Sequence, residues 1–283
     1  MKGYVLITGV STGIGFHATM LFAKNGYHVF GTVRKLDDAK ELESSLGDSF
    51  TPLVVDVQNQ EQIDAAYAFV KEKVGERGLS GLINNAGLAV NGPVMHLKTE
   101  DIAFNMDVNY LGPIRMVQRF GELLGIGTKS PYPPGRILNV SSISGEISRP
   151  FLGPYSASKF ALEAISDAMR VEFGIYNVPV VVIQPGPTKT PIWTKARADQ
   201  GRFQDTDYAP IFRKMDKAVD AVSKGAIEVD KVTKVMLHAF ETPKPKTRYL
   251  VAPNNFLFWL AKTLFTDRML DAMSKKQMAL ARN

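Results

Sequence analysis

The sequence predicts an α/β fold in which a doubly wound parallel sheet is covered by helices on both faces. Segments rich in β-branched residues alternate with amphipathic segments along most of the 283 residues, the rhythm of strands and crossover helices. Residues 4–8 and 178–183 are apolar almost throughout, as expected of parallel strands buried on both faces. Because crossovers are right-handed, these segments predict one doubly wound sheet in a single domain, residues 1–283.

Each element follows from its local pattern. Seven short segments have the apolar, β-branched content of strands, and they span residues 4–8, 28–33, 52–57, 81–84, 136–140, 178–183 and 248–251. Four longer segments between them place apolar residues at helical spacing, and they span residues 13–24, 60–74, 100–124 and 155–173. The chain after the last strand, residues 254–283, is predicted to be a helical tail.

Two segments break this alternation. The sequence SPYPPG at residues 130–135 contains three prolines, so it is predicted to form a rigid loop after the long helix. Residues 187–227 contain further prolines with only short helical patches. They follow a strand at the edge where open α/β sheets bind ligands. We expect residues 187–227 to form a mobile substrate lid, with an ordered surface insertion as the alternative.

The composition limits the classes of function. The chain has no cysteine, which excludes disulfides, thiolate catalysis and cysteine-bound metals. Its four histidines are dispersed without ligand spacing, so no metal site is predicted. No apolar segment is long enough to span a bilayer, and a glycine turn that begins at residue 8 leaves no room for a removable signal peptide. We therefore expect a soluble, cytoplasmic protein.

The net charge of +6 is concentrated in the C-terminal third, because residues 195–283 carry seven more basic than acidic residues. One interpretation is a solvated basic surface that aids solubility. The other is that this part of the chain faces an anionic acyl carrier, a carboxylated substrate or a membrane surface. The basic residues do not follow one helix face with interleaved aromatics, so nucleic acid is not an expected partner.

A glycine-rich turn, TGVSTGIG at residues 8–15, connects the first strand to the first helix. Gly9 permits the tight turn, and the later glycines let a pyrophosphate and the sheet approach the backbone. The N-terminus of the following helix directs its amides at the phosphates. The predicted phosphate-binding residues are Gly9, Ser11, Thr12, Gly13, Ile14 and Gly15.

The residue after the second strand indicates which dinucleotide is bound. A carboxylate at this point accepts a hydrogen bond from the ribose 2′-hydroxyl of NAD, whereas a cationic side chain donates hydrogen bonds to the 2′-phosphate of NADP. Here Val33 ends the strand and Arg34 follows, and an arginine can bind a phosphate with two hydrogen bonds. We expect NADP(H) rather than NAD(H). Asp37 and Asp38 are the competing ribose ligands, but they fall where the next helix should begin, as N-terminal helix charges do.

Two more strand ends complete the predicted nucleotide site. Asp56 and Val57 end the third predicted strand and are expected beside the adenine. Asn85, Ala86 and Gly87 follow the fourth strand, where small residues leave room for the cofactor.

Tyr155 and Lys159 lie four residues apart in YSASK, positions that share a helix face about 5–6 Å apart. A phenol with a pKa near 10 is a poor base. However, an ammonium about 4 Å away would lower this pKa by roughly three units at an effective dielectric of about 20. We therefore expect Lys159 to bring the pKa of Tyr155 toward neutrality. Ser142 is expected to hold the substrate oxygen, and Asn109 to anchor a proton-relaying water.

Six motifs occur in order across about residues 1–195, namely TGVSTGIG, NNAG, DVNYLG, NVSS, YSASK and IQPGPTKT. Together they resemble those of the short-chain dehydrogenases/reductases. The resemblance implies a seven-stranded Rossmann fold and hydride transfer between a nicotinamide and a small-molecule carbonyl or alcohol. It also implies a homodimer or homotetramer formed through the two long helices. The residues that it implies are the catalytic set Asn109, Ser142, Tyr155 and Lys159, with Tyr155 and Lys159 at the nicotinamide ribose and Pro185, Gly186 and Thr188 beside the carboxamide.

A finer resemblance concerns the substrate. YSASKFALEAISDAMRVE and PKTRYLV are similar to segments of retinol, hydroxysteroid and 3-hydroxybutyrate dehydrogenases, which implies a lipophilic steroid- or retinoid-like substrate. A 3-oxoacyl thioester reductase and a non-catalytic nucleotide sensor are the alternatives. We expect the apolar tail to pack on the domain as an ordinary C-terminal helix, with a lipophilic substrate or a membrane surface as the other interpretation. Its residues are Phe256, Leu257, Phe258, Trp259 and Leu260.

Overall fold

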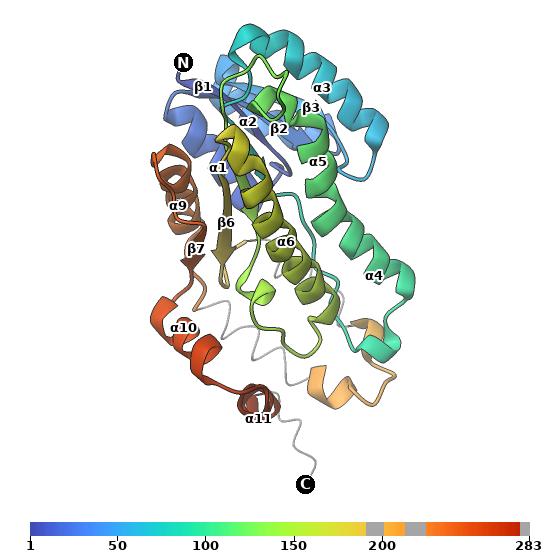
Figure 1. The fold of residues 1–283 in the computed structure, drawn as a ribbon. Coiled ribbons are helices and arrows are strands. Elements are labelled where there is room, and N and C mark those ends of the chain that lie inside the picture. Colours follow the sequence, from blue (N-terminus) through green and yellow to red (C-terminus); the bar gives the residue numbers. More distant parts are fainter. Residues whose placement is uncertain (191–200, 213–224, 278–283) are drawn as a thin grey trace.

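The computed structural model describes residues 1–190, 201–212 and 225–277. Within these ranges seven parallel strands form one sheet in the order β3-β2-β1-β4-β5-β6-β7 (Figure 1). The predicted α/β, doubly wound fold is confirmed. The strands are β1 (Gly3–Ile7), β2 (Tyr27–Val33), β3 (Phe50–Val54), β4 (Gly81–Asn84), β5 (Ile137–Val140), β6 (Val180–Pro185) and β7 (Arg248–Val251).

Helices cover both faces of the sheet and bury two apolar clusters. One face carries α1 (Gly13–Lys24), α2 (Lys40–Leu46) and α9 (Val229–Glu241), whose apolar residues join those of the sheet around Phe22. The other face is built around Phe120. Its helices are α3 (Gln60–Val74), α4 (Thr99–Met106), α5 (Gly112–Phe120) and α6 (Gly153–Glu172).

The direction of winding reverses between β1 and β4. From β1 the chain proceeds outward to β2 and β3, and it then returns to β4 on the other side of β1. β1 and β4 pair in parallel, with Ile7 opposite Ile83. Loops that leave adjacent strands in opposite directions open a crevice at the carboxyl edge, which is where such sheets bind ligands.

The long helix predicted over residues 100–124 is interrupted, so this prediction is wrong in detail. A π-helical segment, Asp107–Leu111, separates α4 from α5, and the amide of Gly112 donates to the carbonyl of Asp107. The sequence contains a local reason. In an α-helix the carbonyl of Asn109 would accept from residue 113, which is Pro113 and has no N–H. A wider turn is therefore the one that continues the hydrogen bonding.

The C-terminal tail forms two helices, α10 (Asn255–Leu264) and α11 (Asp267–Gln277). Figure 1 places both beyond the carboxyl ends of β6 and β7. Among the described helices, none is both long and apolar enough to cross a bilayer.

Candidate functional site

The glycine turn is attached to the strands on both sides of β1. The amide of Gly9 donates to Thr32 Oγ1 at 3.0 Å, and the amide of Val10 donates to the Thr32 carbonyl at 3.0 Å. Gly9 has a φ of +70°, which favours glycine. A Cβ on Gly15 would lie 2.2 Å from the Gly9 carbonyl oxygen. The turn therefore needs glycine at both positions for its shape alone.

A threonine at the end of β1 joins this turn to the fourth strand. Thr8 Oγ1 accepts from the amides of Asn85 and Ala86, both at 2.9 Å. Asn85 Nδ2 donates to the carbonyls of Thr8 and Gly9, both at 2.9 Å. The side chain of Asn85 thus holds the turn, and its predicted contact with a cofactor stays a prediction. Sequence reasoning missed Thr8 and Thr32, although a threonine at a strand end or inside an apolar strand was a readable signal.

The N-terminus of α1 has the features of an anion site. Its N-cap, Thr12, makes no side-chain cap, and the first turn contains no acidic residue. Ser11 and Thr12 are exposed, whereas Ile14 packs against the core. Uncapped amides at a helix N-terminus attract a phosphate. The turn therefore presents backbone donors and two hydroxyls to a pyrophosphate.

The residues that follow β2 and β3 lie at the same edge of the sheet. Arg34 is exposed directly after the buried Val33. Asp37 pairs with Lys40 at 2.8 Å on the surface, as expected of a helix-start charge. Asp56 lies beyond the end of β3 and accepts from a neighbouring amide, so the predicted strand over residues 52–57 is too long at this end.

Val57, predicted to lie beside the adenine, is buried. A Cβ on Gly112 at the start of α5 would lie 2.7 Å from Val57 Cγ2. Val57 is therefore closely packed against this helix, which fixes the position of the loop after β3.

The structure brings Ser142, Tyr155 and Lys159 together at the carboxyl end of β5. Lys159 and Tyr155 share a face of α6, with Lys159 Nζ 5.8 Å from the centroid of the Tyr155 ring. Lys159 is buried, and its Nζ donates to the carbonyl of Val140 at 2.8 Å. Ser142, two residues beyond the end of β5, hydrogen-bonds Tyr155. The three side chains therefore form one polar cluster, in which Ser142 and Lys159 are buried and Tyr155 is partly exposed.

Burial dominates the titration of this cluster. It raises the pKa of the Tyr155 phenol, an effect that the hydrogen bond from Ser142 opposes. It lowers the pKa of Lys159 from 10.5 to about 8, while the carboxylate of Glu163 opposes this shift. The expectation that Lys159 brings the pKa of Tyr155 toward neutrality is therefore wrong for the protein without ligand. Both groups lose water, and the ammonium is bonded to Val140 rather than to the phenol.

Asn109 lies in the π-helical segment and is buried. Its Oδ1 accepts from the amide of Leu88 at 2.9 Å, and its Nδ2 donates to the Leu88 carbonyl at 2.8 Å. Its Nδ2 also donates to Ser158 Oγ at 2.9 Å. The side chain of Asn109 is thus engaged within the protein. Gly87 lies between it and the catalytic helix, since a Cβ there would lie 3.2 Å from Asn109 Oδ1 and 3.7 Å from Lys159 Nζ.

The end of β6 adds the remaining predicted residues. Pro185 is the last residue of β6, and the amide of the following Gly186 donates to Val251 on the β7 side at 2.8 Å. Thr188 Oγ1 donates to the Gly186 carbonyl at 2.9 Å. Thr188 also forms an isolated parallel bridge with Ile227. The two ends of the predicted lid are therefore joined beside the site.

Within residues 187–227 the structure describes 187–190, 201–212 and 225–227, and the rest of the predicted lid lies outside the described residues. In the middle part, Phe203 and Phe212 stack with ring centroids 5.3 Å apart. Phe212 also packs against Phe151, 4.9 Å away, whose backbone has a φ of +65°. An aromatic cluster thus joins this segment to the loop that precedes Tyr155.

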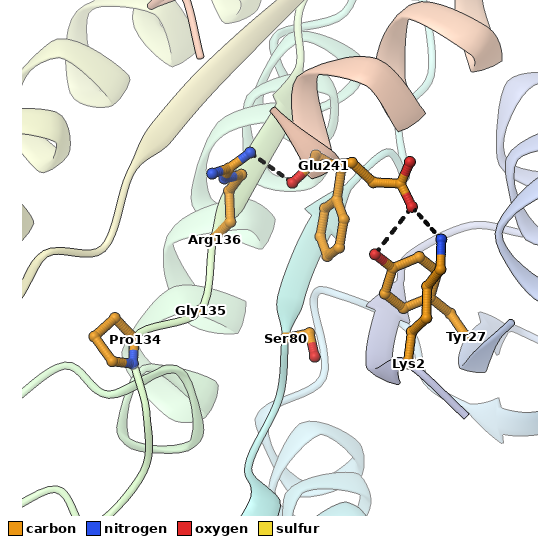
Figure 2. A pocket seen from close by; sticks show the side chains of 8 residues that line it. Lys2, Tyr27, Ser80, Pro134, Gly135, Arg136 and Glu241 are labelled. Carbon is orange, nitrogen blue, oxygen red and sulfur yellow. Dashed lines mark hydrogen bonds and ion pairs between the residues drawn. The ribbon is translucent and has the colours of Figure 1, made fainter. Parts of the chain in front are cut away.

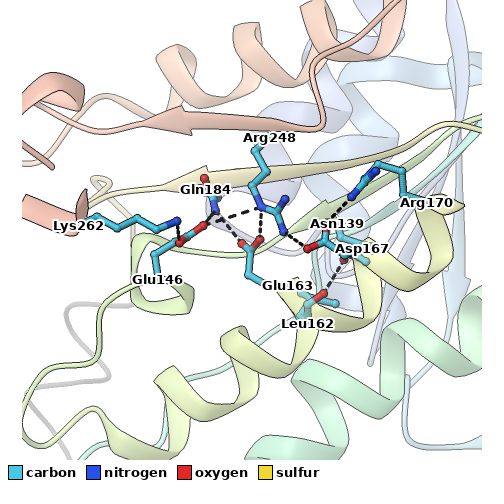
Figure 3. A network of polar contacts seen from close by, with 10 residues as sticks. Asn139, Glu146, Leu162, Glu163, Asp167, Arg170, Gln184, Arg248 and Lys262 are labelled. Carbon is cyan, nitrogen blue, oxygen red and sulfur yellow. Dashed lines mark hydrogen bonds and ion pairs between the residues drawn. The ribbon is translucent and has the colours of Figure 1, made fainter. Parts of the chain in front are cut away.

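A network of ion pairs around the buried Glu163 holds α6, the helix of Tyr155 and Lys159, against the sheet (Figure 3). Glu163, one helical turn after Lys159, accepts from Arg248 Nε at 2.9 Å and from Gln184 Nε2 at 3.0 Å. Arg248 NH2 also donates to Asp167 on the next turn at 2.7 Å. These contacts join α6 to β6 and β7, so they fix the position of Lys159 relative to the carboxyl edge of the sheet.

A separate hollow of about 430 Å³ lies at the opposite, amino edge of the sheet (Figure 2). Glu241 there accepts from Lys2 Nζ at 2.8 Å and from the Tyr27 hydroxyl at 3.3 Å. Burial and this carboxylate raise the pKa of Tyr27 to about 12. Lys2, Tyr27 and Glu241 are thus bonded to one another and join the start of the chain to α9. This hollow lies apart from the candidate site and adds nothing to it.

Comparisons with known proteins identify the family. The family model described as short chain dehydrogenase matches residues 3–201. The NADPH-dependent 3-dehydrocapnine reductase of Ornithobacterium rhinotracheale is 42% identical over 275 residues, which cover 97% of each chain. Retinol dehydrogenase 16 of Mus musculus is 33% identical over 95% of this chain and 87% of its own length.

A solved structure shows the same fold. The crystal structure of a short-chain dehydrogenase from Streptomyces avermitilis superposes with a TM-score of 0.78 at 21% identity, covering 100% of this chain and 99% of the other. The seven-stranded parallel sheet agrees with these comparisons. The chain belongs to the short-chain dehydrogenase family and is an NAD(P)-dependent oxidoreductase.

Proposed function

We propose that the protein is an NADPH-dependent reductase that converts a carbonyl group of a lipophilic molecule to an alcohol. The observation that carries this proposal is that Ser142, Tyr155 and Lys159 converge at the sheet edge that also bears the glycine turn. The helix α1 that follows this turn has no side-chain N-cap. A protein that only senses a nucleotide has no need for a partly buried phenol beside a buried ammonium, because the ammonium costs stability when it is removed from water.

The state of the phenol suits the reducing direction. The raised pKa of Tyr155 keeps the hydroxyl protonated at neutral pH, which is the form that donates a proton to a carbonyl oxygen. Lys159, with a pKa of about 8, is mostly cationic at neutral pH and stabilises negative charge as it develops on the phenol oxygen. Ser142 donates its hydroxyl to the substrate oxygen. When bound, the nicotinamide supplies the hydride.

Asn109 is proposed to act through its main chain. Its side chain is engaged with Leu88 and Ser158, and Pro113 cannot donate to its carbonyl. We assign to this carbonyl, rather than to the side chain, the role of holding a water that returns a proton to the Lys159–Tyr155 pair.

The residues present fit NADP(H). The helix α1 offers amides without a side-chain cap, and the exposed Ser11 and Thr12 beside them can donate hydroxyls to a pyrophosphate. Arg34 is exposed where the 2′-phosphate would lie, and the 3-dehydrocapnine reductase relative is NADPH-dependent by name. These observations support a preference for NADPH over NADH.

The proposed substrate class rests on apolar surroundings. The aromatic cluster of Phe151, Phe203 and Phe212 lies between the start of the catalytic helix and the described lid residues. Two relatives are named for retinol and for 3-dehydrocapnine. We infer that the substrate is lipophilic and enters under this cluster.

The test is a panel of ketones, sterols, retinoids and acyl thioesters with NADPH and NADH. We expect turnover of a lipophilic ketone or aldehyde with NADPH, and a loss of about 10³-fold or more in kcat for Tyr155→Phe with unchanged NADPH binding in a fluorescence titration. Unchanged turnover in Tyr155→Phe would refute the mechanism. A preference for acyl thioesters would replace the substrate class but keep the reaction.

We also propose that the protein is cytoplasmic and forms a homodimer or homotetramer. The assembly rests on a separate observation, the exposed apolar residues of neighbouring helices. Phe104 and Leu111 on the α4–α5 side and Phe160 on α6 are each at least 40% exposed, and these two helices pack against each other. Exposed apolar residues on adjacent helices are typical of an interface between copies. Sedimentation should show a dimer or larger that Phe104→Lys dissociates; a monomer at all concentrations would contradict it.

A further inference from the structure

The C-terminal helices leave aromatic and methionine side chains in solvent. Phe256 is 66% exposed and Trp259 is 54% exposed on α10, and Met269 and Met273 are 47% and 48% exposed on α11. The expectation that the apolar tail packs on the domain is therefore wrong for Phe256 and Trp259. In contrast, Phe258 on the same helix is partly buried. Exposed apolar residues that are grouped on one helix face mark an interaction surface.

Polar contacts at both ends of α10 hold this helix in place. Asn255 at its start donates Nδ2 to the Leu250 carbonyl at 3.0 Å and accepts from the Ala252 amide at 2.7 Å. Lys262 forms an ion pair with Glu146, which follows Ser142 in the chain (Figure 3). Because both ends of α10 are fixed in this way, Phe256 and Trp259 cannot turn inward without breaking these contacts.

The spacing of the residues gives each helix an apolar stripe. Phe256 and Trp259 are three residues apart, and their rings stack with centroids 6.2 Å apart. Met269 and Met273 are four residues apart. Positions separated by three or four residues share a helix face. A helix that exposes an apolar stripe with basic side chains beside it lies in the plane of a membrane interface rather than across it.

The charges beside these stripes are mainly basic. The two helices contain Lys262, Arg268, Lys275 and Lys276 against Asp267 and Asp271. The larger segment, residues 195–283, carries seven more basic than acidic residues. Basic side chains next to interfacial apolar residues are attracted to anionic lipid headgroups. A protein partner would need a complementary apolar groove, and nothing in the structure specifies one.

We propose that α10 and α11 form a docking face for an anionic membrane surface. The face comprises Phe256, Trp259, Met269 and Met273 with Arg268, Lys275 and Lys276 around them. Both helices lie beyond the carboxyl ends of β6 and β7 (Figure 1), the edge that holds Ser142 and Tyr155. Docking by this face turns the open edge of the site toward the bilayer, where a lipophilic substrate dissolves. The proposal rests on the exposed face and does not require the proposed activity.

The test uses the full chain with vesicles of phosphatidylcholine, alone or mixed with phosphatidylglycerol. A Trp193→Phe background leaves Trp259 as the single tryptophan. We expect its emission to shift to shorter wavelength with mixed vesicles and the shift to weaken as salt is added. In sedimentation with mixed vesicles, Phe256→Ser/Trp259→Ser and Lys275→Glu/Lys276→Glu should each lower the partition coefficient at least about tenfold.

The matched control is Val171→Ser/Ile175→Ser. These residues are 69% and 75% exposed and lie at the far end of α6, so this variant should bind vesicles like the wild type. Absence of binding to any vesicle, or equal binding by all variants, would overturn the proposal. So would a dimer, formed without vesicles, that Phe256→Ser/Trp259→Ser dissociates. Turnover of a water-soluble carbonyl should persist in Phe256→Ser/Trp259→Ser, and its absence in the wild type would count against the proposed function alone.

Discussion

Replacing Lys159 by methionine should stabilise the protein while it abolishes turnover. Lys159 is 4% exposed, and burial lowers its pKa from 10.5 to about 8. The difference corresponds to about 3 kcal/mol of unfavourable free energy in the folded state when the amine is charged. Methionine has a similar length and bears no charge, so Lys159→Met removes this cost.

Part of this gain in stability is offset, because Lys159→Met also removes a hydrogen bond. Lys159 Nζ donates to the Val140 carbonyl, and a hydrogen bond from a charged donor contributes about 1.5–3 kcal/mol. The net expectation at pH 7 is that Lys159→Met raises the free energy of unfolding by about 1 kcal/mol, which raises Tm by about 2–4 °C for a chain of this size class.

The pH dependence identifies the cause. The pKa of Lys159 is lower in the folded state than in the unfolded chain, so the unfolded chain binds more protons between pH 8 and 10.5. Wild-type stability therefore gains from this group as pH rises through that window, and the advantage of Lys159→Met disappears. Urea unfolding of both proteins without cofactor, at pH 7 and near pH 10, measures this difference in the free energy of unfolding. Lys40→Met, at an exposed ion pair, is the control and should change little. A Lys159→Met protein that is less stable than the wild type at pH 7, or an advantage independent of pH, would refute the reasoning.

Three further outcomes follow from the site. Gly15→Ala should lower stability by about 1–3 kcal/mol and abolish NADPH binding, because its Cβ would meet the Gly9 carbonyl at 2.2 Å; an undiminished melting temperature and normal binding would contradict this. Arg34→Ala should weaken NADPH binding about 10–100-fold and leave NADH binding unchanged, and an equal loss for both would remove Arg34 from the phosphate site. The raised pKa of Tyr155 should keep kcat for reduction level from pH 6 to about 7, below the pKa of about 8 at which Lys159 loses its charge, whereas alcohol oxidation should rise with pH over this range. Stopped-flow rates in both directions at each pH test this, and reduction that rises with pH would be inconsistent with a phenol donor.

Local patterns predicted most of the fold. The helices over residues 13–24 and 60–74 and the strands over 81–84 and 248–251 begin and end where predicted, because their apolar spacing is bounded by glycine, asparagine or proline. The π-helical segment at Asp107–Leu111 was not predicted, since helical periodicity continues through it. The absent N–H of Pro113 was the signal.

The site was predicted in its composition but not in its bonding. The motifs correctly placed Ser142, Tyr155 and Lys159 together, because strand ends and one helix face determine that proximity. They could not show that Asn85 and Asn109 use their side chains to hold neighbouring backbone, which depends on contacts between distant segments. The direction of the Tyr155 pKa shift was wrong because burial, which a sequence does not display, outweighs a nearby charge.

Titrating Tyr155 itself tests whether this partly buried phenol, beside the buried ammonium of Lys159, is the proton donor at the dinucleotide site. The ultraviolet difference between wild type and Tyr155→Phe reports its ionisation against pH. In the free protein Tyr155 should ionise only above the ordinary tyrosine pKa of 10.0, because burial raises it. Addition of NADP⁺ should move the transition to lower pH, because its positively charged nicotinamide ring would be bound beside the phenol. A Tyr155 that ionises below pH 10 in the free protein, or one that does not respond to NADP⁺, would contradict the account.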